Sequence, residues 1–268
     1  MGIARRDRAR PNRSVFLYAR AAAAARGRFL PPHFVPGVAS PRPPGLAFPA
    51  MEMFLLALPM LLLAVVVHEW AHAWVALKQG DPTAAMLGRV TLNPLPHIDP
   101  FGTILFPLML VMMKAGVILG WARPVPVNPR NFRNYRRGDI LVSLAGVTAN
   151  FVLAAACTVA VVLLIHLARL APGLEPFAEL LIRMARFGVL INLVLACLNL
   201  LPIPPLDGSH VFYHLLPPRL GAWYREMGRF GILILMAILL FAPSAMTVLS
   251  WPIRELQELS EAFIRFWV

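Results

Sequence analysis

Residues 53–77 read MFLLALPMLLLAVVVHEWAHAWVAL, an apolar stretch long enough to cross a bilayer as one helix. The motif His68-Glu69-x-x-His72 interrupts it, and no other charged or imidazole side chain lies in the stretch. Residues four apart share one face of a helix, so both imidazoles can reach one ion. Ionisable groups at this depth are unfavourable unless they pair or bind a metal, so the stretch predicts a functional site inside the membrane.

The motif has the His-Glu-x-x-His pattern of zinc proteases, in which two histidines bind zinc and the glutamate activates water. His68 and His72 are therefore candidate zinc ligands, and Glu69 is the candidate catalytic acid and base. A catalytic zinc ion needs a third protein ligand and one open position for water. One zinc ion per chain is expected.

The third ligand is expected at the inner end of another span. The apolar stretch 180–201 is followed by PIPPLDG at 202–208, where the prolines end the helix. Asp207 in this segment is the only acid near the inner end of another span that does not lie in an evidently solvated loop. An Asp before Gly is common in structural turns, but beside the paired histidines the ligand interpretation is favoured.

The hydropathy pattern predicts an all-α multi-span membrane protein with about four transmembrane helices. The expected spans are roughly 53–77, 139–167, 180–201 and 230–250. Five arginines between residues 123 and 137 mark the cytoplasmic side. The span 53–77 then ends on the cytoplasmic side, and the span 139–167 begins there. The broken apolar stretch 101–120 between them must leave and re-enter the membrane on the same side, so it is predicted to be a re-entrant hairpin. The same reasoning places the candidate site near the cytoplasmic face.

Three further segments complete the expected organisation around a protease core at 51–250. Residues 83–91 are predicted to form a short membrane-associated β segment, and 251–268 an interfacial amphipathic helix. Residues 1–50 hold nine Arg, one acid and many Pro. Two interpretations of them are open: a disordered basic tail, or coding sequence upstream of a true start at Met51 or Met53.

The composition supports a membrane protein and argues against a nucleic-acid partner. Of all residues 59% are hydrophobic and 14% charged, whereas soluble domains carry about 25% charged residues. The net charge is +12, but most of the excess lies in residues 1–50, which the predicted core does not include. The expected partners are the lipid bilayer and a substrate; the oligomeric state stays open.

Two motifs on separate spans resemble those of the site-2 proteases, which are zinc metalloproteases that cut peptide bonds within membranes. They are His68-Glu69-x-x-His72 and Asn199-x-x-Pro202-x-Pro204-x-x-Asp207-Gly208. The family's Gly-x-x-x-Asn motif is matched by Gly146 to Asn150, and the resemblance covers roughly 53–215. The segments GRVTLNPLPHIDP (88–100) and WARPVPVNPRNF (121–132) look like the compact bacterial branch, which lacks PDZ and CBS domains.

The resemblance implies a role for each matched residue. It makes His68, His72 and Asp207 the zinc ligands and Glu69 the catalytic acid and base, and it lets Asn150 and Asn199 hold the substrate or its oxyanion. It further implies a transmembrane-protein substrate, a part in regulated intramembrane proteolysis, and a multi-pass location in the inner cell membrane.

Other polar residues favour simpler interpretations. A catalytically dead zinc binder or metal carrier is the main rival, but this chain keeps Glu69 and all three candidate ligands. His97 and Asp99 are expected to stabilise a turn. His210 and His214 are four apart without a flanking acid, which disfavours a second metal site. Asn192 fits either an interhelical contact or a family-like polar contact, and Cys157 and Cys197 are expected to be free thiols.

Overall fold

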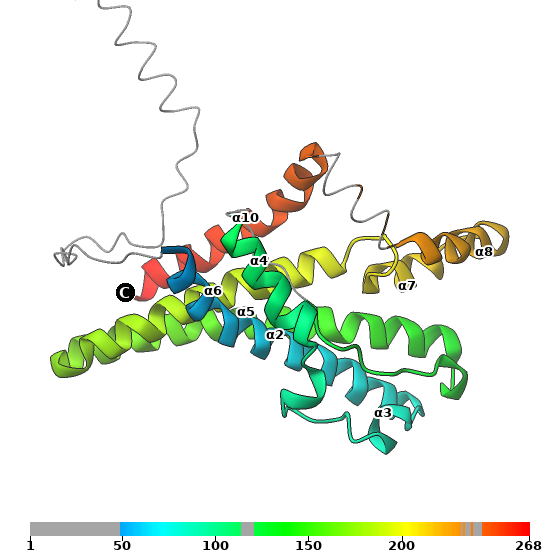
Figure 1. Cartoon of the computed structure of the whole chain (residues 1–268), viewed down its shortest axis with the longest axis horizontal. Coiled ribbons are helices and arrows are strands. Elements are labelled where there is room, and N and C mark those ends of the chain that lie inside the picture. Colours follow the sequence, from blue (N-terminus) through cyan, green and yellow to red (C-terminus); the bar gives the residue numbers. More distant parts are fainter. Residues whose placement is uncertain (1–48, 114–120, 232, 234–236, 238–242) are drawn as a thin grey trace, which may run out of the picture. The chain divides into compact units, whose positions relative to one another are not determined.

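The computed structural model describes residues 49–268 except 114–120, 232, 234–236 and 238–242 (Figure 1). Its regular elements are all helical in that part of the chain, which confirms the α class. Three helices are long and apolar enough to cross a membrane by length and composition: α2 (Pro49–Gln79), α5 (Tyr135–Leu170) and α6 (Glu175–Asn199). They correspond to the first three predicted spans.

The other expected spans fall partly outside the described residues. Of the stretch 230–250, residues 243–250 form the start of helix α10 (Pro243–Trp267), while most of 231–242 is not described. The stretch 101–120 begins with a π-helical turn, η2 (Pro100–Leu105), and α4 (Phe106–Met112), an apolar pair too short to span, and 114–120 is not described. The fourth span and the re-entrant hairpin therefore stay predictions, as does the tail at 1–50.

The three long helices pack against one another (Figure 1), and small residues lie at their contacts. Ala57, Leu61 and Ala64 of α2 pack against Ile191 of α6 in one buried cluster. Gly188 of α6 lies where a Cβ atom would come within 2.8 Å of Cys157 Sγ of α5 and 2.5 Å of Met60 Cε of α2. Small residues let the helix backbones approach closely, as is usual in membrane bundles. The two cysteines are buried and free, as predicted.

Short elements connect the long helices and carry the polar segments of the site. They are α3 (Thr83–Met86), η1 (Leu95–His97), η3 (Pro129–Asn131), η4 (Pro172–Leu174), α7 (Asp207–Tyr213), α8 (Pro218–Met227) and η5 (Gly228–Phe230). Between α4 and η3, residues 121–128 run without regular structure, and Val125 among them contacts Glu69 of α2.

The predicted β segment at 83–91 is wrong. Residues Thr83–Met86 form helix α3, and a turn at Gly88, with a φ of 65°, follows it. Asp81 accepts a hydrogen bond from the Thr83 N–H at 3.1 Å, which fixes the first turn. The local sequence Ala-Ala-Met-Leu also favours a helix, so helix propensity and this contact outweighed the weak β signal.

Helix α10 packs on α5 and α6. Ile253 and Ile264 are buried, Ser260 lies 2.7 Å from the Thr158 hydroxyl of α5, and Glu261 pairs with Arg186 of α6. Part of the apolar face predicted for 251–268 is thus covered by the protein itself, whereas Leu259 and Phe266 are exposed. The interfacial placement of this helix stays a prediction.

Asp81 is fully buried just beyond α2 and joins three segments through its carboxylate. Its Oδ1 accepts from Thr83 and from Asn131 Nδ2 at 2.8 Å, and its Oδ2 accepts from the Asn128 N–H at 2.7 Å. Burial raises the pKa of Asp81, but these hydrogen bonds outweigh burial and hold the pKa below its ordinary value. The loop at 128–131 is therefore tied to the end of α2 by one ionised carboxylate.

Replacing Asp81 by Asn should lower the thermal midpoint of the detergent-solubilised protein by about 5 °C or more at pH 7, since an amide cannot accept all these bonds. Because the folded-state pKa is lowered, this stabilisation is complete above the ordinary carboxyl pKa of about 3.9 and is lost as the pH falls through the folded value. The difference between wild type and variant should therefore shrink on acidification below about pH 4. Equal midpoints at pH 7 would contradict this role; Glu255→Gln, at an exposed site on α10, is the control.

Candidate active site

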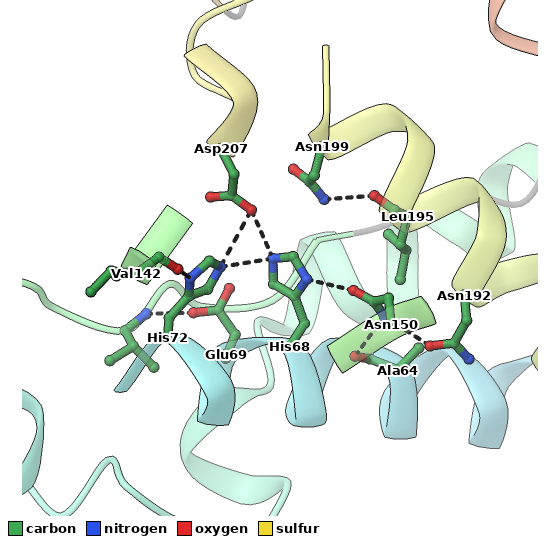
Figure 2. A network of polar contacts seen from close by, with 11 residues as sticks. Ala64, His68, Glu69, His72, Val142, Asn150, Asn192, Leu195, Asn199 and Asp207 are labelled. Atoms are coloured by element: carbon green, nitrogen blue, oxygen red, sulfur yellow. Dashed lines mark hydrogen bonds and ion pairs between the residues drawn. The ribbon is translucent and has the colours of Figure 1, made fainter. Parts of the chain in front are cut away.

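Three predicted ligands converge at one point between α2 and α7 (Figure 2). His68 and His72 lie on successive turns of α2, and Asp207 is the first residue of α7. The two Nε2 atoms are 2.9 Å apart, and Asp207 Oδ2 lies 3.2 Å from that of His68 and 3.3 Å from that of His72. Both histidines are 8% exposed, so this polar triangle is enclosed by protein.

The geometry of this triangle fits a zinc ion. Tetrahedral zinc with bonds of about 2.0–2.1 Å has neighbouring ligand atoms about 3.3 Å apart, close to the separations observed. Asp207 Oδ2 is buried and has no hydrogen-bond donor; its polar neighbours are the two imidazole Nε2 atoms. In the described part of the chain, this is the one group of three His, Cys, Asp or Glu side chains close enough to share a metal ion.

The far side of each imidazole is held by a hydrogen bond. His68 Nδ1 donates to Asn150 Oδ1 at 2.5 Å, and His72 Nδ1 donates to the Val142 carbonyl at 2.7 Å. With the proton on Nδ1, each Nε2 presents a lone pair toward the centre of the triangle. Such outer hydrogen bonds commonly fix the tautomer and orientation of histidines that bind metals.

The amide of Asn150 is fully engaged in this arrangement. Its Oδ1 accepts from His68, and its Nδ2 donates to Asn192 Oδ1 at 2.8 Å and to the Ala64 carbonyl at 3.3 Å. Asn192 lies on α6, so its bond to Asn150 of α5 is an interhelical contact, and its own Nδ2 donates to the Gly188 carbonyl of the same helix at 2.8 Å. Both asparagines have no exposed surface. Asn150 therefore contacts a candidate ligand from behind and has no surface that a substrate could reach.

Gly146 lies one turn before Asn150 and provides the space for both rings. A Cβ atom there would come within 2.5 Å of His72 Nε2 and 2.6 Å of His68 Cε1. Contacts under 3.0 Å require the neighbouring atoms to move. The Gly-x-x-x-Asn spacing thus has a physical reason: glycine admits the imidazoles, and the asparagine one turn later orients one of them.

Glu69 is held next to the histidines by a backbone donor. Its Oε2 accepts a hydrogen bond from the Val125 N–H at 2.7 Å, which leaves Oε1 without that donor (Figure 2). The segment that carries Val125 is fixed in turn, because the Trp121 N–H donates to Gly102 O at 3.1 Å and the Arg123 N–H to His97 O at 2.8 Å. The carboxylate is therefore placed beside the polar triangle by an ordered segment.

Asp207 is positioned by the proline-rich segment that follows α6. Leu206 is extended, and α7 begins at Asp207 itself. A Cβ atom on Gly208 would lie 2.3 Å from the Leu200 carbonyl oxygen, so only glycine allows α7 to start this close to the end of α6. In this position its carboxylate Oδ2 faces both imidazole Nε2 atoms, and an ionised carboxylate is the form that binds a cation.

Asn199 and His97 are not part of the ligand triangle, and the sequence did not reveal the cluster that His210 and His214 form with Asp139. Asn199 ends α6, and its Nδ2 donates to the Leu195 carbonyl at 3.0 Å (Figure 2). His97 Nε2 lies 3.0 Å from the Thr91 carbonyl, in agreement with a turn role. His210 and His214 both bind the carboxylate of Asp139 on α5, a partner 71 and 75 residues earlier that their spacing could not reveal.

Comparison with known proteins points to one family of peptidases. The family model described as "Peptidase family M50" matches residues 164–242. A protein of Bacillus subtilis named "Putative zinc metalloprotease YwhC" is 41% identical over 198 residues, which cover 72% of this chain and 82% of that protein. Two proteins named "Putative zinc metalloprotease Rip2" are similar as well: 29% identity in Mycolicibacterium smegmatis (70% of this chain, 68% of that protein) and 30% in Mycobacterium tuberculosis H37Rv (72% and 69%). No solved structure matches the chain.

A membrane-embedded metallopeptidase is the class of protein that the helices, the polar triangle and these relatives define together. The chain belongs to peptidase family M50, the site-2 proteases. It is a metalloendopeptidase, and its cofactor is zinc.

Proposed function

We propose that this protein cleaves peptide bonds of transmembrane segments near the cytoplasmic face of the inner membrane, with His68, His72 and Asp207 as zinc ligands and Glu69 as the acid and base. The convergence of the two Nε2 atoms and Asp207 Oδ2 within 3.3 Å of one another carries this proposal. A third candidate ligand from a separate helix is what a catalytic site with one open position requires.

Each residue of the site has a separate role in the proposed reaction. When bound to these ligands, zinc supplies Lewis-acid activation of the attacking water and of the scissile carbonyl. Glu69 Oε1 accepts the proton of the water and delivers it to the leaving nitrogen, while the Val125 N–H holds Oε2 and keeps the carboxylate in place. Asn150 orients His68 and Asn192 orients Asn150, so we assign both to the support of the ligands. Asn199, at the end of α6, is the remaining candidate for a substrate contact.

The depth of the site supports a cut near one end of the substrate helix. His72 lies seven residues before the end of α2, or about 10 Å along the helix axis at 1.5 Å per residue. The segment that contacts Glu69 leads directly into the arginines at 123–137, which favour the cytoplasmic side. A substrate that enters from the bilayer would then be cut close to that side, and such cuts release cytoplasmic fragments in regulated proteolysis.

The rival function, zinc binding without catalysis, is disfavoured by one contact. Glu69 is not a candidate ligand, yet its carboxylate is held beside the ligand triangle by a dedicated backbone hydrogen bond. A storage or transport site has no need of such a group, whereas a hydrolase needs a base at this place.

Asp207→Ala tests the proposal with the purified full-length chain in detergent. The wild type should bind one zinc ion and cut a single-span reporter protein; the variant should lose zinc affinity by at least about 100-fold and lose cleavage, because two protein ligands remain. Asp99→Ala is the matched control, since Asp99 caps η2 and lies outside the triangle. Mass spectrometry of the products gives the position of the cut. Zinc-free wild type, or a variant that keeps zinc and activity, would refute the assignment.

A further inference from the structure

Asp139, His210 and His214 form a second polar cluster, between the start of α5 and helix α7. Asp139 Oδ1 accepts from His210 Nδ1 at 3.2 Å, and Oδ2 accepts from His214 Nε2 at 2.8 Å. The side chains of Asp139 and His214 are 9% and 6% exposed, whereas that of His210 is 52% exposed. Because each imidazole binds a different carboxylate oxygen, the arrangement holds two points of α7 against α5 and does not bring three atoms toward one ion.

The cluster lies on the same face of α7 as Asp207. His210 and His214 follow Asp207 by three and seven residues, and such spacing aligns side chains on one face of a helix. Helix α7 has only seven residues, and helices this short are not stable without tertiary contacts. The orientation of Asp207 toward the two imidazoles must therefore come from the contacts of α7 with its neighbours.

His214 is enclosed by further contacts that keep it at this place. Its ring packs against the rings of Tyr135 and Tyr213, with centroid distances of 5.3 and 5.0 Å. Arg136 donates to the His214 carbonyl at 3.1 Å. Arg225 of α8 lies over the Tyr213 ring at 4.0 Å and donates to the Tyr135 hydroxyl at 2.7 Å. The end of α7 is thus fixed on α5 through a polar core and an aromatic surround.

One face of α5 contacts all three candidate ligands or their supports. Positions 139, 142, 146 and 150 are separated by three, four and four residues, so they lie on one helical face. The Val142 carbonyl holds His72, and the Asn150 amide holds His68. The side chain at position 139 hydrogen-bonds to His210 of α7 and to His214 at its end, and α7 is the element that carries the third ligand.

We propose that Asp139 is a positioning residue for Asp207 and acts through His210 and His214. The proposal rests on the proposed function, because it takes Asp207 as a zinc ligand. In this arrangement α5 positions all three ligands. Asp139 in its first turns holds α7, and later turns hold the two histidines of α2. Loss of the Asp139 carboxylate frees α7 to rotate and withdraws Asp207 from the site.

The test measures zinc affinity of the full-length chain by competition with a chelator. Asp139→Leu should lower the affinity by about 10-fold or more, the usual effect of removing a group that orients a metal ligand. It should also change the visible absorption of bound Co²⁺, which reports the arrangement of the ligands. Thr158→Val is the matched control: it removes a buried polar contact from the same helix, to Ser260 of α10, and should leave zinc affinity and the Co²⁺ spectrum unchanged.

A double-mutant cycle separates positioning from a general structural effect. In the Asp207→Ala background, Asp139→Leu should cause no further loss of zinc affinity, because its target is already absent. An equal loss in both backgrounds, or no loss in the wild type, would overturn the proposal. Should Asp139→Leu fail to fold, His214→Phe replaces it as the test. Phenylalanine keeps a ring between the two tyrosines but loses the bond to Asp139, so zinc affinity should fall several-fold. Wild-type affinity in Asp207→Ala alone would instead overturn the proposed function.

Discussion

Glu69→Gln is expected to abolish cleavage of a transmembrane reporter while zinc stays bound. Glutamine keeps the size of the side chain and can still accept the hydrogen bond from the Val125 N–H, but it cannot take up a proton. The loss of a positioned acid and base should reduce kcat by about 1000-fold or more. Zinc affinity should stay within about 3-fold of the wild type, since Glu69 is not part of the ligand triangle.

The combination of the two measurements makes this result specific. Glu255→Gln, the same substitution at an exposed site on α10, should change neither quantity. Cleavage at the wild-type rate by Glu69→Gln would show that another group moves the proton. Loss of zinc together with activity would show that the substitution disturbed the ligands, and the catalytic role of Glu69 would then lack support.

The parts of the fold that sequence could predict are those with strong local patterns. The first three spans follow from apolar stretches near 20 residues long, although α5 extends from Tyr135 to Leu170, beyond the predicted 139–167. The difference has a local cause: Asn134 caps the helix by accepting from the Arg137 N–H at 3.0 Å, so α5 begins in the basic segment. The prediction of a β segment at 83–91 was wrong because residues 83–86 form helix α3. The hydrogen bond from the Thr83 N–H to Asp81 at the start of this helix is a contact that hydropathy does not show.

The candidate site was predictable to a different extent for each residue. His68, Glu69 and His72 form a local motif, and Asp207 could be paired with them because both lie at the inner ends of spans. The role of Asn150 could not be read from sequence, since a buried amide and a substrate-facing amide give the same pattern. Asp139 was missed because its partners are more than 70 residues away, and only the packing of α7 on α5 brings them together.

Gly146→Ala is expected to lower zinc affinity strongly and to stop cleavage, although it adds only one methyl group far from Asp207 in sequence. The new Cβ would lie 2.5 Å from His72 Nε2 and 2.6 Å from His68 Cε1, so both rings must move. Neither can turn away freely, because each Nδ1 is held by a hydrogen bond to α5 itself, through Val142 and Asn150. Movement of the rings breaks these bonds and spreads the Nε2 atoms. Zinc affinity should fall by about 100-fold or more, and cleavage should be lost.

Helix α5 should stay folded in Gly146→Ala, although the variant loses zinc affinity. Alanine favours a helix over glycine by about 1 kcal/mol, so loss of zinc without unfolding is the expected signature. Gly188→Ala is the matched control, since the same methyl group in the same bundle meets Cys157 and the flexible end of Met60 instead of the imidazoles. It should leave zinc affinity near the wild-type value even if it lowers thermal stability. Wild-type zinc affinity in Gly146→Ala would mean that the imidazoles are not confined by α5, and the explanation of the Gly-x-x-x-Asn motif would be wrong.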